Sequence, residues 1–225
     1  MQPGPEPAAL KAWIETSLRD NSHTLAAGYQ GKTLEYRDAD YHLVIKVPHG
    51  RGLVKYLHTL MLRHEHRVYQ QLGEFDPSPK CYGMVDNNYL VLEFVNAKSI
   101  RERRPKNPQL FFEQLIRQIR QMHGRHVAHM DLKKKDNLLV TDNDMPCIID
   151  FGAAVIYKPG LLHILNHAWY RLAVRFDYNA WIKHKYHDNT HNISTEDQQF
   201  YQRTWIEHAA SNIKSAYRSL TKFFK

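Results

Sequence analysis

A chain of 225 residues is long enough to bury a substantial core in one or two domains, and its 43% hydrophobic and 24% charged residues are typical of a globular protein. The 31 lysines and arginines exceed the 23 aspartates and glutamates, and the net charge is +8. This charge favours a polyanionic partner such as a nucleotide, a phosphorylated sugar, nucleic acid or an anionic membrane, although a basic surface that only aids solubility explains it equally well.

Several other protein classes are excluded by what the sequence lacks. The two cysteines, Cys81 and Cys147, are too few for a disulfide framework and do not have the spacing of a metal site. No run of eighteen apolar residues predicts a membrane span, and the first residues lack the pattern of a signal peptide. We therefore expect a cytoplasmic protein, either soluble or peripheral at the inner face of the cell membrane.

The N-terminal part predicts a short helix followed by a strand meander. Residues 1–7 are interpreted as a flexible tail, and apolar side chains at helical spacing predict a helix over 8–18 that packs on this half of the chain. Alternating segments then predict strands at 23–27, 33–37 and 42–47. Glycines Gly28 and Gly31 in the first turn can lay backbone N–H groups over phosphates, but a plain hairpin turn is the simpler explanation.

A lysine and a glutamate in this half form a candidate pair. Lys46 is flanked by apolar strand residues, and Glu65 follows 19 residues later on a helix predicted between Leu53 and Leu72. A carboxylate at that distance can hold the lysine against the phosphates of a nucleotide. Each residue alone is more typical of a solvated surface, but the motifs below favour the pair.

The next strand, 89–95, can join two lobes of the protein. Its main chain at Glu93 and Val95 can then present a carbonyl and an N–H group to an adenine, whereas an ordinary core strand is equally compatible with the sequence. A basic cluster follows, which is either a solvated connector or a lip that grips an anionic acceptor: Lys98, Arg101, Arg103, Arg104 and Lys106.

A capped core helix leads into the most informative stretch. Asn107 and Pro108 predict the start of this helix, which ends near Gly124. In the segment that follows, Asp131 can accept or orient the proton of an acceptor hydroxyl, and Lys133 can reach a transferring phosphoryl group. Asp150 can ligate Mg²⁺ that bridges the phosphates.

A second ligand for that magnesium ion is expected from the same loop. Either the carboxylate of Asp136 or the amide of Asn137 can complete the metal shell.

These motifs closely resemble the catalytic and DFG segments of the protein-kinase-like superfamily, namely His129-Met130-Asp131-Leu132-Lys133 and Ile148-Ile149-Asp150-Phe151-Gly152. Lys46, Glu65 and residues 92–95 fall where that family has its strand lysine, helix glutamate and hinge. The resemblance covers about residues 24–185. It implies ATP and Mg²⁺ as cofactors, with Asp131 as the catalytic base and Asp150 as a metal ligand.

The sequence departs from the family pattern at four places. The glycine-rich loop is degenerate, Met130 replaces the usual arginine, and no A-P-E motif follows Asp150. Asn137 lies six residues after Asp131 instead of five, so the loop contains an extra residue. We favour Asn137 over Asp136 as the metal ligand, because the apolar strand begins directly after Asn137 as it does in the family.

The acceptor is predicted from the short remainder of the chain. Only 73 residues follow Gly152. In this short C-terminal part the chain resembles the lipopolysaccharide core (Kdo/heptose) kinases and the RIO-type kinases. We favour the first group, which implies a sugar or glycolipid acceptor and no nucleic-acid partner. The alternatives are an atypical Ser/Thr protein kinase, and a nucleotide-binding pseudokinase that acts as an interaction module.

Three features of the last third have two interpretations each. The segment 161–176 is either a core helix or a surface for an amphiphilic phosphosugar lipid, and Asp177 either braces the catalytic loop or lies on the surface. The basic amphipathic segment 205–224 either packs on its own domain or lies on an anionic membrane. His64, His66, His184 and His187 lack further zinc ligands, and we expect them at the surface.

The sequence as a whole predicts an α+β, two-lobed protein-kinase-like fold with a small antiparallel sheet and a reduced, mainly helical C-lobe. We expect the tail and first helix at 1–21, the N-lobe at 22–96, and the C-lobe at 97–225 with the basic helix at its end.

Overall fold

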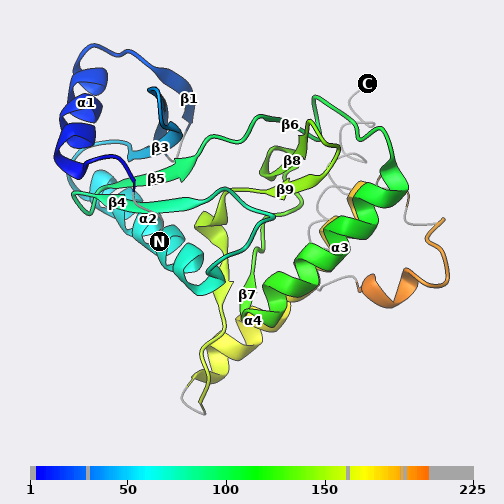
Figure 1. The fold of residues 1–225 in the computed structure, drawn as a ribbon. Coiled ribbons are helices and arrows are strands. Elements are labelled where there is room, and N and C mark those ends of the chain that lie inside the picture. Colours follow the sequence, from blue (N-terminus) through cyan, green and yellow to red (C-terminus); the bar gives the residue numbers. More distant parts are fainter. Residues whose placement is uncertain (1–3, 29–30, 161–162, 188, 190–191, 203–225) are drawn as a thin grey trace, which may run out of the picture.

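An antiparallel sheet of five strands forms the centre of the N-terminal lobe in the computed structural model, which describes residues 4–28, 31–160, 163–187, 189 and 192–202 (Figure 1). Neighbouring strands follow the order β1-β2-β3-β5-β4. Their bounds are Thr24–Gly28 for β1, Gly31–Arg37 for β2, His42–Pro48 for β3, Cys81–Val85 for β4 and Tyr89–Glu93 for β5. The predicted meander is confirmed, but β4 was not predicted.

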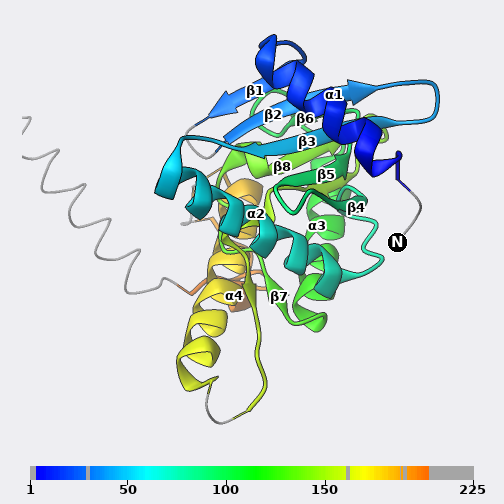
Figure 2. The same ribbon diagram turned by 90° about the vertical axis from the view of Figure 1, so that its left-hand side faces the viewer.

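Two helices cover opposite faces of this sheet (Figure 2). Helix α1, Pro7–Arg19, buries Leu10 and Ile14 in one cluster with Val91 of β5, whereas α2, Gly52–Leu72, shares a second cluster with Leu90 and Leu92. Alternate residues of a strand point to opposite faces, so β5 is buried on both sides.

The prediction that residues 1–7 form a tail is wrong for its last residues. The helix α1 begins at Pro7, and the carboxylate of Glu6 accepts hydrogen bonds from the backbone N–H groups of Ala8 and Ala9. A carboxylate at this position satisfies N–H groups that have no partner within the helix. Helix α1 thus belongs to the core of the N-terminal lobe, as expected.

The C-terminal lobe is mainly helical. Helices α3, Pro108–Gly124, and α4, Ile164–Lys185, pack on each other (Figure 1). The Asn107 side chain accepts a hydrogen bond from the N–H of Leu110 at 3.2 Å, so the predicted cap of α3 is confirmed. Two small sheets flank the segments that contain Asp131 and Asp150. Strand β6, Ala97–Ser99, pairs with β8, Leu138–Thr141, and β8 pairs with β9, Pro146–Ile148, while β7, Val127–Ala128, pairs with β10, Val155–Ile156.

Helix α4 is longer than the predicted helix over 161–176. It continues to Lys185 because Ala180, Trp181 and Ile182 bury further apolar surface against the lobe. The predicted helix over 205–224 lies outside the described residues. No described helix is long and apolar enough to cross a membrane.

A single hydrophobic cluster joins the two lobes. It contains Leu62 of α2 and Leu92 of β5 together with Phe111 of α3 and Phe151, which follows Asp150. Because the same cluster touches elements on both sides of the cleft, the residues of the cleft are held by one continuous core.

Candidate active site

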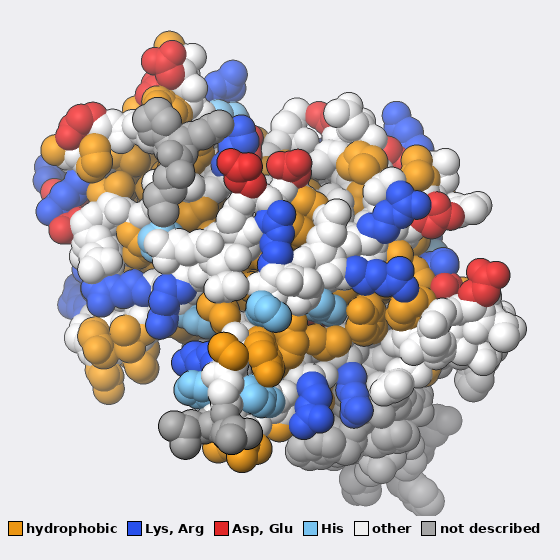
Figure 3. Space-filling view, turned by 60° about the horizontal axis from the view of Figure 1, so that its bottom comes forward, with side chains coloured by type: hydrophobic (Ala, Val, Ile, Leu, Met, Phe, Trp, Pro, Cys, Tyr) orange, Lys and Arg blue, Asp and Glu red, His pale blue; other side chains and the backbone are white. Residues whose placement is uncertain are grey.

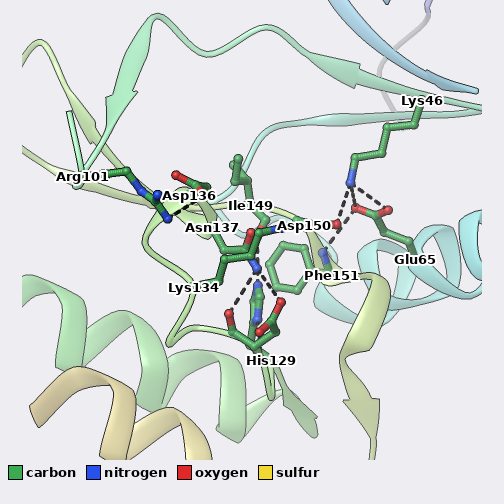
Figure 4. A network of polar contacts seen from close by, with 11 residues as sticks. Lys46, Glu65, Arg101, His129, Lys134, Asp136, Asn137, Ile149, Asp150 and Phe151 are labelled. Carbon is green, nitrogen blue, oxygen red and sulfur yellow. Dashed lines mark hydrogen bonds and ion pairs between the residues drawn. The ribbon is translucent and has the colours of Figure 1, made fainter. Parts of the chain in front are cut away.

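Lys46, Glu65 and Asp150 meet between the lobes (Figure 4). The Lys46 Nζ atom on β3 donates to both carboxylate oxygens of Glu65 on α2, at 2.8 and 3.0 Å, and to Asp150 Oδ1 at 3.0 Å. Glu65 is 2% exposed, and this lysine supplies the positive charge that compensates its carboxylate. The structure therefore brings together three of the predicted site residues.

The charges of this cluster shift the proton affinities of its members. Burial alone would lower the pKa of the Lys46 ammonium, but the charges of Glu65 and Asp150 outweigh it and raise that pKa to about 12. Burial alone would raise the pKa of the Asp150 carboxyl, but the nearby Lys46 ammonium holds it below its ordinary value. Both groups are consequently charged at neutral pH.

Asp131 and Asn137 form a second pair across the cleft from Lys46. The amide nitrogen of Asn137 donates to the backbone oxygen and to the Oδ2 atom of Asp131, both at 3.1 Å. Since its nitrogen is engaged, the amide oxygen of Asn137 is the atom that can face a metal ion. Asp136 has a different environment, because its Oδ2 atom accepts from Arg101 at 3.1 Å and its side chain is 47% exposed.

Two successive turns accommodate the extra residue of the loop. The N–H of Lys134 donates to the Asp131 carbonyl and the N–H of Asn137 donates to the Lys134 carbonyl. The second turn is a short 3-10 helix, Lys135–Asn137. Because the chain reverses direction in these turns, Asn137 lies beside Asp131 although it is six positions further along the sequence.

The structure adds a lysine that the sequence interpretation did not consider. Lys134 lines the cleft and its Nζ atom is 3.9 Å from Asp150 Oδ2, whereas Lys133 is exposed and is not among the described residues that line the cleft. Because the loop contains an extra residue, the spacing from Asp131 does not identify which lysine faces the cleft. The fold distinguishes Lys134 from Lys133. The role predicted for Lys133 stays a prediction.

Asp177 braces the loop that contains Asp131, as one of the two interpretations of the sequence predicted. This fully buried carboxylate accepts hydrogen bonds from the backbone N–H groups of His129 and Met130, both at 2.8 Å, and from His123 Nε2 at 2.9 Å. Met130 has a left-handed backbone with a φ of 68°, which is unfavourable for such a side chain. The bonds to Asp177 hold this conformation immediately before Asp131.

Asp150 is also held in a left-handed conformation, with a φ of 66°. The following N–H group, of Phe151, donates to Glu65 Oε1 at 3.3 Å. The Phe151 ring packs between Tyr69 of α2, with ring centroids 5.2 Å apart, and His129, at 5.0 Å. These contacts connect α2, the predicted catalytic loop and the segment around Asp150 in one packed column.

One cavity of about 760 Å³ contains most of the predicted residues. Its walls include Lys46, Glu65, Asp131, Asp136, Asn137 and Asp150. The β1–β2 hairpin contributes Leu25, Ala26, Lys32 and Thr33 to these walls. The role of its turn over phosphates stays a prediction. Gly28 and Gly31 are the last paired residues before the tip, residues 29–30, which lies outside the described part of the chain.

The connection between the lobes forms the far wall of the cavity. Glu93, Phe94 and Val95 all line it. The N–H groups of Glu93 and Phe94 already donate to the carbonyls of Lys80 and His42, both at 2.9 Å. Val95 is therefore the better candidate for an N–H that contacts an adenine.

Two arginines of the basic cluster that follows β5 contact acidic residues. Arg101 pairs with Asp136, and Arg103 pairs with Asp142 at 2.9 Å. These contacts favour the connector interpretation for the two arginines.

The surface position predicted for His184 is wrong. This side chain is 7% exposed, and its Nε2 atom lies 2.8 Å from the carbonyl oxygen of Leu132 in the catalytic loop. Burial follows from the unpredicted extension of α4. His64 is also partly buried, with Nε2 at 2.7 Å from the Ala154 carbonyl, and His187 is exposed as predicted.

Comparison with known proteins identifies the family of this site. A family model described as the protein kinase domain matches residues 54–175, just over half of the chain. Serine/threonine-protein kinase D of Synechocystis sp. is 31% identical over 97 residues, 40% of this chain and 19% of that protein. CBL-interacting protein kinase 17 of rice (Oryza sativa subsp. japonica) is 33% identical over 132 residues, 53% of this chain and 27% of that protein.

A fungal protein gives a similar match. Mitogen-activated protein kinase mpkC of Aspergillus terreus is 32% identical over 115 residues, 49% of this chain and 29% of that protein. The chain thus spans less than a third of the length of these curated relatives.

Proposed function

The chain belongs to the protein kinase domain family, and from this premise we propose that it is a phosphotransferase that moves the γ-phosphoryl group of ATP to a hydroxyl group with Mg²⁺. The observation that carries the proposal is the gathering of Lys46, Asp131, Asn137 and Asp150 around one cavity of about 760 Å³. Positioned charges of this kind are most of what phosphoryl transfer requires.

Each of these residues has a proposed task. The Lys46 ammonium, fixed by Glu65, contacts the phosphates of ATP, and Asp131 orients the acceptor hydroxyl and accepts its proton. The main chain at Glu93 and Val95 holds the adenine, and the β1–β2 hairpin with Gly28 and Gly31 covers the phosphates. Lys133, or Lys134 beside Asp150, stabilises the transferring group.

Asp150 and Asn137 are the residues that would hold Mg²⁺. Carboxylate and amide oxygens are the hard ligands that Mg²⁺ prefers, and the bound ion would neutralise charge on the phosphates. Asp136 is the weaker candidate because Arg101 already engages its carboxylate.

The comparisons favour the hydroxyl of a serine or threonine as acceptor. One relative similar to this chain, from Synechocystis sp., is named as a serine/threonine-protein kinase, and another, from Aspergillus terreus, is named as a mitogen-activated protein kinase. This departs from our preferred prediction from the sequence, which was a sugar of a lipopolysaccharide core.

A sugar or glycolipid remains the second candidate acceptor. The observation that favours it is the row Lys133, Lys134 and Lys135, whose three side chains are exposed beside Asp131. Such a row suits an acceptor that is itself phosphorylated.

Substitution of the two aspartates tests the catalytic proposal. Asp131→Ala and Asp150→Ala should each lower phosphoryl transfer by about 10²–10⁴-fold. The melting temperature of Asp131→Ala should stay within the range of an exposed control, Asp40→Ala, whereas Asp150→Ala loses its pairing with Lys46 and should melt lower but still cooperatively. Transfer at the control rate in either variant would refute the assignment. Binding of ATP without any turnover in the unsubstituted protein would instead support the pseudokinase alternative.

Labelled ATP distinguishes the acceptors. The protein is incubated in parallel with a protein extract and with an extract of cell-envelope lipids. Label in polypeptides that survives lipid extraction supports a protein kinase, and label confined to the lipid fraction supports the glycolipid alternative.

A further inference from the structure

Large apolar side chains are exposed mainly at the starts of two helices. Among the described residues, eight of the eleven exposed large hydrophobic side chains lie in α2 or α4. The first turns of α2 carry Leu53, 72% exposed, with Val54, Tyr56, Leu57 and Leu60, and the first turns of α4 carry Leu165, 87% exposed, with Ile164 and Trp169. Single exposed apolar residues are ordinary, but such clusters indicate a surface that contacts a partner.

The charges beside these side chains have one sign. Residues 51–63 and 163–176 contain no aspartate or glutamate, whereas they include Arg51, Lys55, Arg171 and Arg175. Ile164, Ala168, Arg171 and Arg175 follow one another at spacings of three and four residues, which places them along one face of α4. The partner of this surface should therefore be both anionic and apolar.

The ends of the helices add to the positive potential. Neither α2 nor α4 has a side-chain cap or an acidic residue in its first turn. By contrast, α1 and α3 are capped by the side chains of Glu6 and Asn107. The positive end of the helix dipole is thus left available in the two helices that expose apolar side chains.

Both helix starts project from the body of the molecule. In Figure 2 the start of α2 lies at the left edge and the described start of α4 lies at the foot. Figure 3 turns the lower side of Figure 1 toward the viewer, and on this side hydrophobic side chains are interspersed with lysines, arginines and histidines.

We infer that the starts of α2 and α4, residues 51–60 and 163–175, together form a surface that docks on an anionic lipid bilayer. Leucine, isoleucine and tryptophan enter the boundary between headgroups and acyl chains, while the arginines and lysine contact anionic headgroups. This inference concerns binding and does not depend on phosphoryl transfer.

Other partners fit the same surface less well. In a symmetric dimer this basic surface would face the same basic surface of the second copy, which would bring arginines against arginines. Nucleic acid supplies phosphates but no apolar phase for Leu165. A fluid bilayer can receive two separate projecting ends, whereas a protein partner would need a matched groove for each.

Vesicle co-sedimentation of the full chain tests the inference. Binding is expected with vesicles of phosphatidylcholine and phosphatidylglycerol and not with phosphatidylcholine alone. The double variant Leu165→Glu, Trp169→Glu should weaken binding by at least about tenfold, and Arg171→Ala or Arg175→Ala by about fivefold each. Matched controls on another surface are Leu110→Glu, a residue 46% exposed on α3, and the exposed Arg104→Ala, which should bind as the unsubstituted protein does.

A second arm separates this surface from the basic segment at 205–224. The variant Ile213→Glu, Leu220→Glu is measured in the same assay. If these changes abolish binding while the α4 variants bind normally, the inference is overturned. The inference is also overturned if the unsubstituted protein does not co-sediment with anionic vesicles. The same holds if the α4 variants bind vesicles normally and differ only in converting a dimer to a monomer in size-exclusion chromatography.

Discussion

Lys46 is the residue at which a strand, a helix and the segment after the catalytic loop meet. Its ammonium compensates Glu65, which is 2% exposed, and also Asp150. The sequence indicated the pair Lys46 and Glu65 from their spacing, because a strand followed by a helix brings such residues together. It did not indicate that Asp150, 104 residues after Lys46, would bond to the same nitrogen atom.

Replacing this lysine should destabilise the protein. Lys46→Met leaves the Glu65 carboxylate buried without its partner, and the free energy of unfolding should fall by about 3 kcal/mol, the low end for a broken buried pair because the Lys46 side chain is 21% exposed. Urea denaturation measures the change. The exposed Lys55→Met serves as control, and the double variant Lys46→Met, Glu65→Gln should recover part of the loss. Equal stability of Lys46→Met and the control would contradict the compensation of charge.

The two thiols should react slowly. Burial raises the pKa of the Cys81 thiol to about 11 and that of the Cys147 thiol to about 12, so both are neutral at pH 8. Alkylation of the folded protein by iodoacetamide at pH 8, followed by mass spectrometry, should therefore be much slower than in urea. Rapid labelling of Cys147 without unfolding would show that its environment is open to solvent.

At the scale of elements, α4 is the part that sequence patterns described least well. The apolar pattern over 161–176 predicted its first half, but the first half is the exposed part, and the buried part continues to Lys185. Helical periodicity shows that a face is apolar and cannot show which neighbour covers it. The buried half carries Asp177 and His184, both of which contact the catalytic loop.

Asp177 does not line the cavity, yet it should be important for the conformation of the loop. In Asp177→Asn one oxygen is replaced by an NH₂ group that faces backbone donors, and loss of a charge-assisted hydrogen bond should cost about 2 kcal/mol of stability. Because Met130 would lose its support, phosphoryl transfer should fall as well. Thermal denaturation and a transfer assay measure both, with Asp142→Asn, 60% exposed, as control. A stable and fully active Asp177→Asn would contradict the bracing role.

For the whole molecule, one continuous core and one charged network fix how the lobes meet. Phe151 packs between Tyr69 of the N-terminal lobe and His129 of the C-terminal lobe, next to the bonds of Lys46. The sequence predicted the two lobes but contains no local signal for these contacts, since they join residues far apart in the chain.

The network should stabilise the fold over a wide pH range. The raised pKa of Lys46 means that its contribution is complete below pH 10.5, the ordinary lysine value, and is lost as the pH rises through about 12. The lowered pKa of Asp150 means that its contribution is present above the ordinary aspartate value of 3.8 and is lost as the pH falls through the lower folded value.

The difference in unfolding free energy between the unsubstituted protein and Lys46→Met measures this contribution. It should be flat from about pH 5 to 10 and shrink outside that window. A step near pH 6.5, the region where histidine titrates, would show that a histidine controls the network instead.

The sequence by itself determined the family resemblance, the strand and helix order around Lys46 and Glu65, and the cap of α3, because these depend on local spacing and on side chains close in the chain. The tertiary structure decided which oxygen and nitrogen atoms meet. It placed Asn137 against Asp131 by two turns, engaged Asp136 with Arg101, brought Lys134 to Asp150, and buried Asp177 and His184 beneath the loop. These contacts depend on how distant segments pack, and packing is a property of the whole core that no short stretch of residues specifies.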